Sequence, residues 1–318
     1  MITQSFKNKV VFIMGATGTG KSRLSIDLAT NFPAEIINSD KIQIYRGLNI
    51  VTNKITNLEC QEVPHHLLGE FDPDSDFTAR DFCHHALIAI EKIVRFGHIP
   101  IIVGGSNSFI EALVEDPDFK FRSQYDCCFI WLDVSLPILH SFVSKRVDQM
   151  VDAVMHLRVT LARMVFKASK FVWIVDEVRE LFTPEVDYTR GIRRAIGVRE
   201  MDRYFRVEPE IDNETKEMLL GVAIEEIKAN TRKLVHTQLT KIHRLRDKLG
   251  WPLHRIDATC VFEKGGQEAN HAWEELVAKP SLEVVNEFLK ENKNGVVAVK
   301  NISSAFVNQR LNGLKVLN

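Results

Sequence analysis

The feature of this sequence that most constrains its fold is a glycine-rich stretch, residues 15–22, which fits the pattern G-x-x-x-x-G-K-[ST]. The apolar residues 10–14 before it predict a buried strand, and apolar residues recur after it at helical spacing. Strand, glycine loop and helix in this order favour a phosphate-binding loop strongly over an ordinary glycine turn. The residues predicted to bind phosphate are Gly15, Ala16, Thr17, Gly18, Thr19, Gly20, Lys21 and Ser22.

The chemistry of such a loop follows from its residue types. Glycines allow backbone N–H groups to turn toward an anion, and the N-terminus of the following helix adds partial positive charge. Lys21 supplies a full positive charge at the end of the loop. The hydroxyl of Ser22 comes next, at the position that holds magnesium in loops of this kind, so Mg²⁺ is the expected cofactor.

Length and composition limit the class of protein. A chain of 318 residues can bury a large core, and we expect two lobes rather than one compact domain. Lys and Arg number 41 against 42 Asp and Glu, so no overall positive charge attracts nucleic acid, although small anions remain possible ligands. Five cysteines without a C-x-x-C pair argue against a disulfide framework or a zinc site. No signal peptide or membrane-spanning run is visible, so we expect a soluble protein in a reducing compartment.

Short apolar runs alternate with helical patterns through the first half of the chain. Residues 35–40, 99–103 and 129–133 have the character of further buried strands. This alternation predicts an α/β fold, a P-loop NTPase-like doubly wound parallel sheet. We expect residues 1–150 to form this core, with room for later residues to complete the sheet, and residues 151–318 to form a second, mainly helical lobe.

Asp40 ends the second predicted strand, at the sheet edge where ligands bind in open α/β sheets. Residues 41–47 (KIQIYRG) then combine an aromatic ring, two bases and an amide, a composition able to stack on a planar base and to hydrogen-bond with it. An aspartate here has an equally ordinary role as the N-cap of a helix. The residues alone leave both interpretations open.

Two other polar groups have functional interpretations that the sequence does not favour. His65 and His66 are consecutive in a turn-rich region, residues 49–76, and no third ligand lies at a recognisable spacing, so metal binding is the less favoured reading. Asp133 ends the fourth predicted strand, like the magnesium-binding carboxylate of phosphate-loop enzymes. Acids often end strands for structural reasons, however, so this interpretation is also the less favoured one.

Helical patterns dominate the second half of the chain, while Thr78 is the predicted N-cap of an earlier helix. Residues 223–249 predict one long helix rich in Lys and Arg, and residues 189–204 form another basic stretch. Runs of charge are usually solvated surface, but together these two predict a second lobe that faces an anion. A short amphipathic helix is expected over residues 281–289.

Taken together, these motifs resemble one family, the isopentenyltransferases that make cytokinins in plants, which are related to the tRNA dimethylallyltransferases. Besides the glycine loop, the resemblance is carried by residues 38–45 (NSDKIQIY), 51–54 (VTNK), 63–69 (VPHHLLG) and 104–113 (GGSNSFIEAL). Residues 188–197 (YTRGIRRAIG) are similar to the plant branch. The likeness covers nearly the whole chain.

The resemblance implies an adenylate dimethylallyltransferase, which transfers a dimethylallyl group from dimethylallyl diphosphate to N6 of ATP, ADP or AMP, the first step of cytokinin biosynthesis. It implies that Asp40 accepts the proton of the N6 amine and that Lys21 and the loop bind the departing diphosphate. Ser106 takes the place of a family hydroxyl residue that assists at the reacting carbon. The residues expected to bind the nucleotide are Lys41 and Gln43 and, at its phosphates, Arg193, Arg194 and Lys241.

Two departures from the family pattern are visible. Residues 154–174 separate two stretches that are almost adjacent in the family, so this segment is interpreted as an insertion, either a surface helix or a translated intron. Its apolar end, residues 171–174, has no identified partner, which favours the intron and predicts that these side chains are exposed. The family's basic residue before Gln238, a contact to the prenyl diphosphate, is replaced by Thr237, which predicts reduced activity.

Three alternatives remain open. A tRNA dimethylallyltransferase would need a broad basic surface and, in eukaryotes, often a zinc finger, so tRNA is an unexpected partner. A small-molecule kinase shares the glycine loop but not residues 38–45 or 104–113. A nucleotide-binding protein without turnover would fit the insertion and Thr237. The expected enzyme is a monomer that binds dimethylallyl diphosphate and an adenine nucleotide and no membrane. It is expected in the cytoplasm, or in plastids if a transit peptide is missing from this chain.

Overall fold

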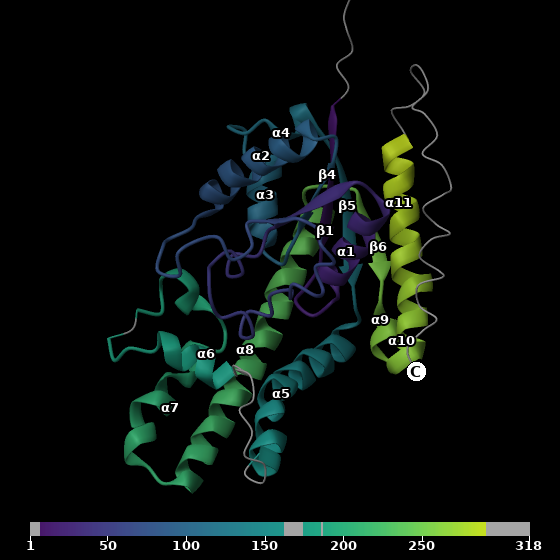
Figure 1. Cartoon of the computed structure of the whole chain (residues 1–318). Helices are drawn as coiled ribbons and strands as arrows, with labels where there is room; N and C mark the ends of the chain where they lie inside the picture. Colours follow the sequence, from purple (N-terminus) through teal and green to yellow (C-terminus); the bar gives the residue numbers. More distant parts are fainter. Residues whose placement is uncertain (1–6, 162–173, 186, 291–318) are drawn as a thin grey trace, which may run out of the picture.

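The computed structural model describes residues 7–161, 174–185 and 187–290, with the backbone alone for 151–161. At its centre is a six-stranded parallel sheet with helices on both faces (Figure 1), which confirms the predicted α/β fold. The strands are β1 (Asn8–Met14), β2 (Ala34–Asn38), β3 (His65–His66), β4 (Ile99–Val103), β5 (Tyr125–Asp133) and β6 (Leu253–Asp257), in the spatial order β3-β2-β4-β1-β5-β6.

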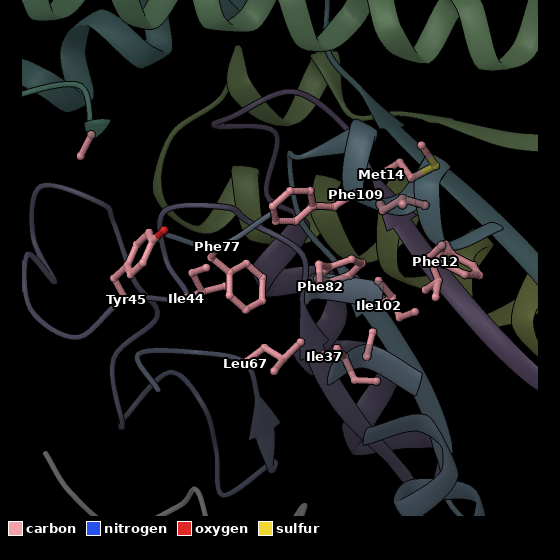
Figure 2. Close-up of a cluster of buried hydrophobic side chains, with 14 of the residues drawn as sticks. Phe12, Met14, Ile37, Ile44, Tyr45, Leu67, Phe77, Phe82, Ile102 and Phe109 are labelled. Carbon is pink, nitrogen blue, oxygen red and sulfur yellow. The ribbon is translucent and has the colours of Figure 1, made fainter. Parts of the chain in front are cut away.

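Strand β1 lies between β4 and β5, and its side chains divide the interior into two cores. Phe12 and Met14 point into one core, which Figure 2 shows with Phe82 of α2 (Ala79–Arg95) and Phe109 of α3 (Asn107–Glu115). Val11 points into the other core, which packs against α1 (Lys21–Asn31) and α11 (Lys279–Lys290). Because both faces are covered, the central strands are continuously apolar, as in other parallel sheets.

Capping side chains set the starts of α2 and of the long basic helix α8 (Asn213–Asp247). The Thr78 side chain accepts from the backbone N of Asp81, and the Asp81 carboxylate accepts from the backbone N of Thr78, so the predicted cap of α2 is confirmed. Helix α8 starts earlier than residue 223, because Asp212 caps it by accepting from the backbone N of Thr215 at 2.8 Å.

One group of helices, here called the second lobe, lies below the sheet in Figure 1. It comprises α5 (Leu136–Leu161), α6 (Ile174–Leu181), α7 (Asp202–Val207), the short 3₁₀ helices η1 (Gly191–Arg194), η2 (Arg199–Met201) and η3 (Glu208–Glu210), and part of α8. It shares a hydrophobic core with the sheet, so the division into domains at residue 150 stays a prediction. After α8 the chain returns to the sheet, where β6 pairs with β5. The remaining elements are α4 (Phe121–Gln124), α9 (Thr259–Phe262), α10 (Gly266–Trp273) and the π-helical segment η4 (Glu274–Ala278). Later residues therefore complete the sheet, for which the sequence left room.

The proposed insertion, residues 154–174, lies largely outside the described residues, which omit 162–173. Its last residue, Ile174, is described: it begins α6 and is only 2% exposed. The expectation that Ile174 is exposed is therefore wrong. Its side chain lies beside Gly197, where a Cβ added to the glycine would lie 3.8 Å from Ile174 Cδ1. Among the described residues, none of the helices combines the length and apolar character that a membrane span requires.

Candidate active site

A cavity of about 490 Å³ opens where β1, β2 and β4 end, at the carboxyl edge of the sheet. Helices α5 and α8 and the short helix η1 also contribute to its walls. The structure brings together in this cavity the predicted site residues Thr17, Gly18, Gly20, Lys21, Ser22, Asp40, Lys41, Gln43 and Arg194. Ligands that reach the glycine loop and Asp40 would therefore meet in one space.

The glycine loop joins β1 to α1 as the sequence predicts. Gly20 precedes the helix with a left-handed φ of 92°, and a Cβ added to it would lie 2.6 Å from the ring of Trp273, so glycine is required here for two reasons. The first amides of α1 have no acceptor within the helix and are available to an anion. Gly15, Ala16 and Thr19 are buried and give the loop its shape without lining the cavity.

Lys21 is folded back onto its own loop, where its Nζ donates to the carbonyl oxygen of Ala16 at 2.6 Å. Burial lowers its pKa from 10.5 to about 8; the negative charge of Asp40 opposes this shift, and the positive charge of Arg146 adds to it. A buried ammonium group beside a second cation is destabilised until an anion binds. The arrangement suits a ligand with more than one negative charge.

Arg146 of α5 is that second cation, and sequence reasoning missed it. Its Nη2 donates to Thr17 Oγ1 at 3.3 Å, whereas its buried Nε has no partner among the described residues, and burial lowers the pKa of Arg146. A sequence signal exists: Arg146 interrupts the apolar stripe formed by Val143, Val147 and Met150 at helical spacing. A positive charge on an apolar helix face is costly unless an anion pairs with it, and the cavity supplies space for such an anion.

Gln238 of α8 is another residue that the sequence did not single out as functional. Its buried side chain accepts from the backbone N of Thr17 at 2.7 Å and donates from Nε2 to the carbonyl oxygen of Gly105 at 3.0 Å. A Cβ on Gly105 would lie 2.3 Å from Gln238 Nε2, so any larger residue there would displace this amide. Gln238 thus ties the phosphate loop to the turn after β4. Its neighbour Thr237 is exposed and bonds to Lys233 O of its own helix at 3.0 Å.

Asp40 follows β2 and caps a turn rather than a helix. Its Oδ1 accepts from the backbone N of Ile42 at 2.9 Å and of Gln43 at 3.3 Å, and residues 41–44 form turns. The helix-cap interpretation is therefore wrong, although the same type of contact is made. Oδ2 accepts no hydrogen bond from the described part of the chain, so this oxygen is available to a proton donor in the cavity.

Ser106 lies next to this turn but is not among the residues that line the cavity. Its Oγ accepts from the backbone N of Lys41 at 2.9 Å. This contact holds the residue that follows Asp40, whereas a direct role of Ser106 at a reacting carbon stays a prediction.

Three cations, two of which line the cavity, lie near enough to one another for their charges to interact. Burial lowers the pKa of Lys41, and the positive charges of Arg194 and Lys241 lower it further. Arg194 lines the cavity and donates to the hydroxyl of Tyr45 at 2.9 Å. Lys241 is near enough for its charge to act on Lys41 but does not line the cavity, and Arg193 pairs with Asp74, which does not line it either. The structure thus brings Lys41, Arg194 and Lys241 together and leaves Arg193 apart.

The histidine pair has a structural explanation. His66 Nε2 lies 2.7 Å from one Glu35 oxygen and His98 Nδ1 lies 2.8 Å from the other. Although burial opposes it, these two hydrogen bonds hold the pKa of Glu35 below its usual range. His65 turns the other way, toward the cavity, as strand neighbours do. Within the ranges described, no group of three His, Cys, Asp or Glu could hold a metal.

Asp133 ends β5, but Arg255 of β6 donates to its Oδ2 from Nε at 2.8 Å, and Asp133 does not line the cavity. The interpretation of Asp133 as a magnesium-binding carboxylate is therefore not supported, because its charge is already paired inside the sheet.

Comparison with known proteins places the chain among prenyl-transferring enzymes. A family model described as IPP transferase matches residues 43–124. Adenylate isopentenyltransferase 3, chloroplastic, of Arabidopsis thaliana is 54% identical over 89% of this chain and 80% of its own length. Adenylate isopentenyltransferase 7, mitochondrial, of the same plant is 50% identical over 90% of this chain and 82% of its own. The tRNA dimethylallyltransferase 2 of Arabidopsis thaliana is 30% identical over 91% of this chain and 82% of its own length.

Solved structures with the same fold include a eukaryotic dimethylallyltransferase that acts on tRNA, with a TM-score of 0.67 and 23% identity over 98% of this chain and 87% of that one. A tRNA isopentenylpyrophosphate transferase from Bacillus halodurans has a TM-score of 0.65 and 24% identity, over 89% of this chain and 99% of that one. At this level of identity the two structures support the fold alone.

Proposed function

Because the chain belongs to the adenylate isopentenyltransferase family, we propose that it transfers a dimethylallyl group from dimethylallyl diphosphate to N6 of an adenine nucleotide, ATP, ADP or AMP. The observation that carries this proposal is the meeting of two unlike groups in one cavity. Half-buried cations at the glycine loop suit a diphosphate, and an available carboxylate oxygen on Asp40 suits an amine that must lose a proton.

The donor half of the cavity consists of the loop residues Thr17, Gly18, Gly20, Lys21 and Ser22 together with Arg146. In the proposed reaction the bond between C1 of the dimethylallyl group and the diphosphate oxygen breaks, and negative charge grows on the diphosphate. Loop amides, Lys21 and Arg146 are already oriented around that charge and stabilise it as it develops. Lys21 exchanges its contact with Ala16 O for a phosphate oxygen.

The acceptor half consists of Asp40, Lys41, Gln43 and Arg194 with the neighbouring residues Val51, Thr52, Asn53 and Ile55. The N6 nitrogen forms a bond to C1 as the diphosphate leaves, and Asp40 Oδ2 takes the proton that the amine loses. An exocyclic aromatic amine is a poor nucleophile, so a carboxylate held at fixed distance assists its attack. The two amide contacts to Oδ1 leave only Oδ2 for this task.

Magnesium fits the donor half. Ser22 is exposed in the cavity, and its hydroxyl makes no hydrogen bond with the described residues. Mg²⁺ usually keeps several waters and takes few protein ligands besides substrate phosphates, and the hydroxyl that ends a phosphate loop is one of them, so Ser22 fits the ion. When bound, the ion would neutralise charge on the diphosphate.

Lys41, Arg194 and Lys241 are the residues we propose for the phosphates of the acceptor. Three cations in mutual repulsion favour an acceptor with several negative charges, so ADP and ATP are expected to bind more tightly than AMP. For the compartment, the organelles in the names of the relatives favour plastids over the cytoplasm. Imaging the complete natural protein with a C-terminal fluorescent tag tests that proposal.

The test incubates purified protein with dimethylallyl diphosphate and Mg²⁺ and offers AMP, ADP, ATP or tRNA as acceptor. Mass spectrometry of the products should detect dimethylallyl-ADP and dimethylallyl-ATP. Prenylated tRNA without a prenylated nucleotide would identify the tRNA enzyme instead, and a phosphorylated product would identify a kinase. The absence of any product would contradict the proposal, with an Arabidopsis relative as the positive control.

A further inference from the structure

A buried carboxylate in the second lobe contacts the wall of the cavity. Glu177 of α6 is 9% exposed, and its two oxygens accept from the backbone N of Ile50 at 3.0 and 2.9 Å. Oε2 also accepts from the backbone N of Val51 at 3.0 Å. Hydrogen bonds from two consecutive amides to a carboxylate that is withdrawn from water are strong and fix both partners. Glu177 has no part in the transfer proposed for the cavity.

The segment that Glu177 holds, residues 48–55, is here called the wall loop, because Val51, Thr52, Asn53 and Ile55 line the cavity. The wall loop contains a single helix-like turn, in which Thr52 N donates to Leu48 O at 3.0 Å and Lys54 N to Asn49 O at 2.9 Å. The first amides of such a turn lack acceptors within it. Glu177 satisfies them from another element, as an N-cap side chain would do within a helix.

The far end of the wall loop is connected to Asp40. Gln43 Nε2 donates to the carbonyl oxygens of Thr52 at 2.9 Å and Asn53 at 3.1 Å. The backbone N of the same Gln43 donates to Asp40 Oδ1 at 3.3 Å. A continuous series of hydrogen bonds therefore runs from Glu177 through the wall loop and Gln43 to the carboxylate that we propose as the base.

We propose that Glu177 is a positioning residue, which fixes the wall loop and, through Gln43, the orientation of Asp40 toward the acceptor nucleotide. This inference rests on the proposed function. Glu177 does not line the cavity, and its hydrogen bonds within the described residues go to the wall loop and not to the glycine loop, so we assign its effect to the acceptor half. Loss of an anchor that displaces a base by about 1 Å can reduce the rate roughly 100-fold.

The main test compares Glu177→Ala and Glu177→Gln with Glu180→Gln, an exposed carboxylate on the same helix. For Glu177→Ala we expect kcat to fall roughly 10- to 100-fold and KM for ADP to rise, with the Kd for inorganic diphosphate within about twofold of wild type. Glu177→Gln keeps one acceptor oxygen, so its kcat and KM should lie between those of wild type and Glu177→Ala. Glu180→Gln should match wild type in both. Equal losses of rate and diphosphate affinity, or no loss of either, would overturn the proposal.

Glu177→Gln serves as the decisive variant if the alanine variant does not fold. A second measurement combines Glu177→Ala with Gln43→Ala. Since both act through the same series of contacts, the double variant should be no slower than the slower single variant, and additive losses would contradict the series.

Failure of the proposed function would be distinguishable. If the wild-type protein transfers no prenyl group, the Kd for ADP still reports on the wall loop: Glu177→Ala should weaken ADP binding several-fold while Glu180→Gln leaves it unchanged. An unchanged Kd for ADP in Glu177→Ala would reject the role of Glu177 whatever the enzyme's reaction.

Discussion

The two halves of the cavity are built in opposite ways. The donor half comes largely from one contiguous segment, residues 15–22, whose shape follows from a strand, three glycines and a helix start. The acceptor half is assembled from Asp40, the wall loop and Arg194 of η1, and Glu177 of α6 holds the wall loop from outside the cavity. Local backbone geometry fixes the first half, whereas contacts between distant segments fix the second.

The two halves also differ in how their charge is balanced. In the donor half, Lys21 and Arg146 are both partly withdrawn from water, and neither forms an ion pair with a carboxylate in the described part of the chain. The free protein therefore bears a cost that a bound anion removes. In the acceptor half, Asp40 and Glu177 are each held by backbone amides. Loss of a positive charge should therefore weaken either half, since Lys41, Arg194 and Lys241 repel one another beside the acceptor. The acceptor half should in addition respond to changes in the backbone that holds its carboxylates.

Asp40→Ala should have the largest effect. We expect kcat to fall about 10²- to 10⁴-fold, since the variant lacks a base, while the Kd for inorganic diphosphate changes little. Asp40→Asn is the matched control, because its amide oxygen can still accept from the Ile42 and Gln43 amides and preserve the turn. Both variants should be similarly slow. A loss of diphosphate affinity as large as the loss of rate would break the division into halves.

Lys21→Ala and Arg146→Ala should each weaken diphosphate binding roughly 10- to 100-fold, as expected for one charge-assisted hydrogen bond. The rate should fall as well, since the same groups meet the charge of the transition state. Lys145→Ala, an exposed neighbour on α5, is the control and should bind diphosphate like wild type. Isothermal titration with inorganic diphosphate and Mg²⁺ measures the difference. Retained affinity in Arg146→Ala would exclude this residue from the donor half.

The lowered pKa of Lys21 predicts a dependence of stability on pH. Its folded pKa is about 8 against 10.5 ordinarily, so between these values the unfolded chain binds more protons. The stability of the ligand-free protein should therefore rise with pH across this window as far as Lys21 contributes. Lys54 has a similar folded pKa of about 8, so the contribution is isolated as the difference between wild type and Lys21→Met. Urea unfolding at pH 7.5 and pH 10 measures the free energy of unfolding of both proteins. An equal change in this free energy between the two pH values for wild type and Lys21→Met would contradict the prediction.

Thr237→Lys should have the smallest effect. A lysine here restores the basic residue expected in the family and lies one position before Gln238, which contacts the phosphate loop. Exposed charge pairs contribute up to about 1 kcal/mol, so diphosphate affinity should improve only a few-fold. Thr237→Gln controls for side-chain length. An improvement of more than about 100-fold would show that this position limits the donor half far more than its exposure suggests.

Sequence patterns predicted the donor half better than the acceptor half for a physical reason. The glycine loop, Lys21 and Ser22 are encoded next to one another, so spacing alone indicated their neighbourhood. Arg146 and Gln238 lie more than a hundred residues further on, and only the packing of α5 and α8 brings them to the loop. Asp40 was recognisable because strand ends meet at one sheet edge, but no pattern linked it to Glu177.

The basic residues illustrate the same limit. Arg193 and Arg194 are indistinguishable in sequence, yet η1 directs one toward Asp74 and the other toward the cavity. Likewise, the long helix α8 was predicted from its periodicity, while its start at Asn213 depended on the Asp212 cap. Element type follows from the apolar pattern, whereas the direction of an individual side chain depends on tertiary contacts.

The central claim, that one cavity holds two separate half-sites, is tested most directly by binding ADP in the presence of a thiolo analogue of dimethylallyl diphosphate that cannot react. Fluorescently labelled ADP would be titrated with and without saturating analogue and Mg²⁺. Separate halves predict that both ligands bind together, with the Kd for ADP unchanged or lower when the analogue is present. Displacement of ADP by the analogue would contradict the account, because it would mean that the glycine loop holds the phosphates of the nucleotide, as in a kinase.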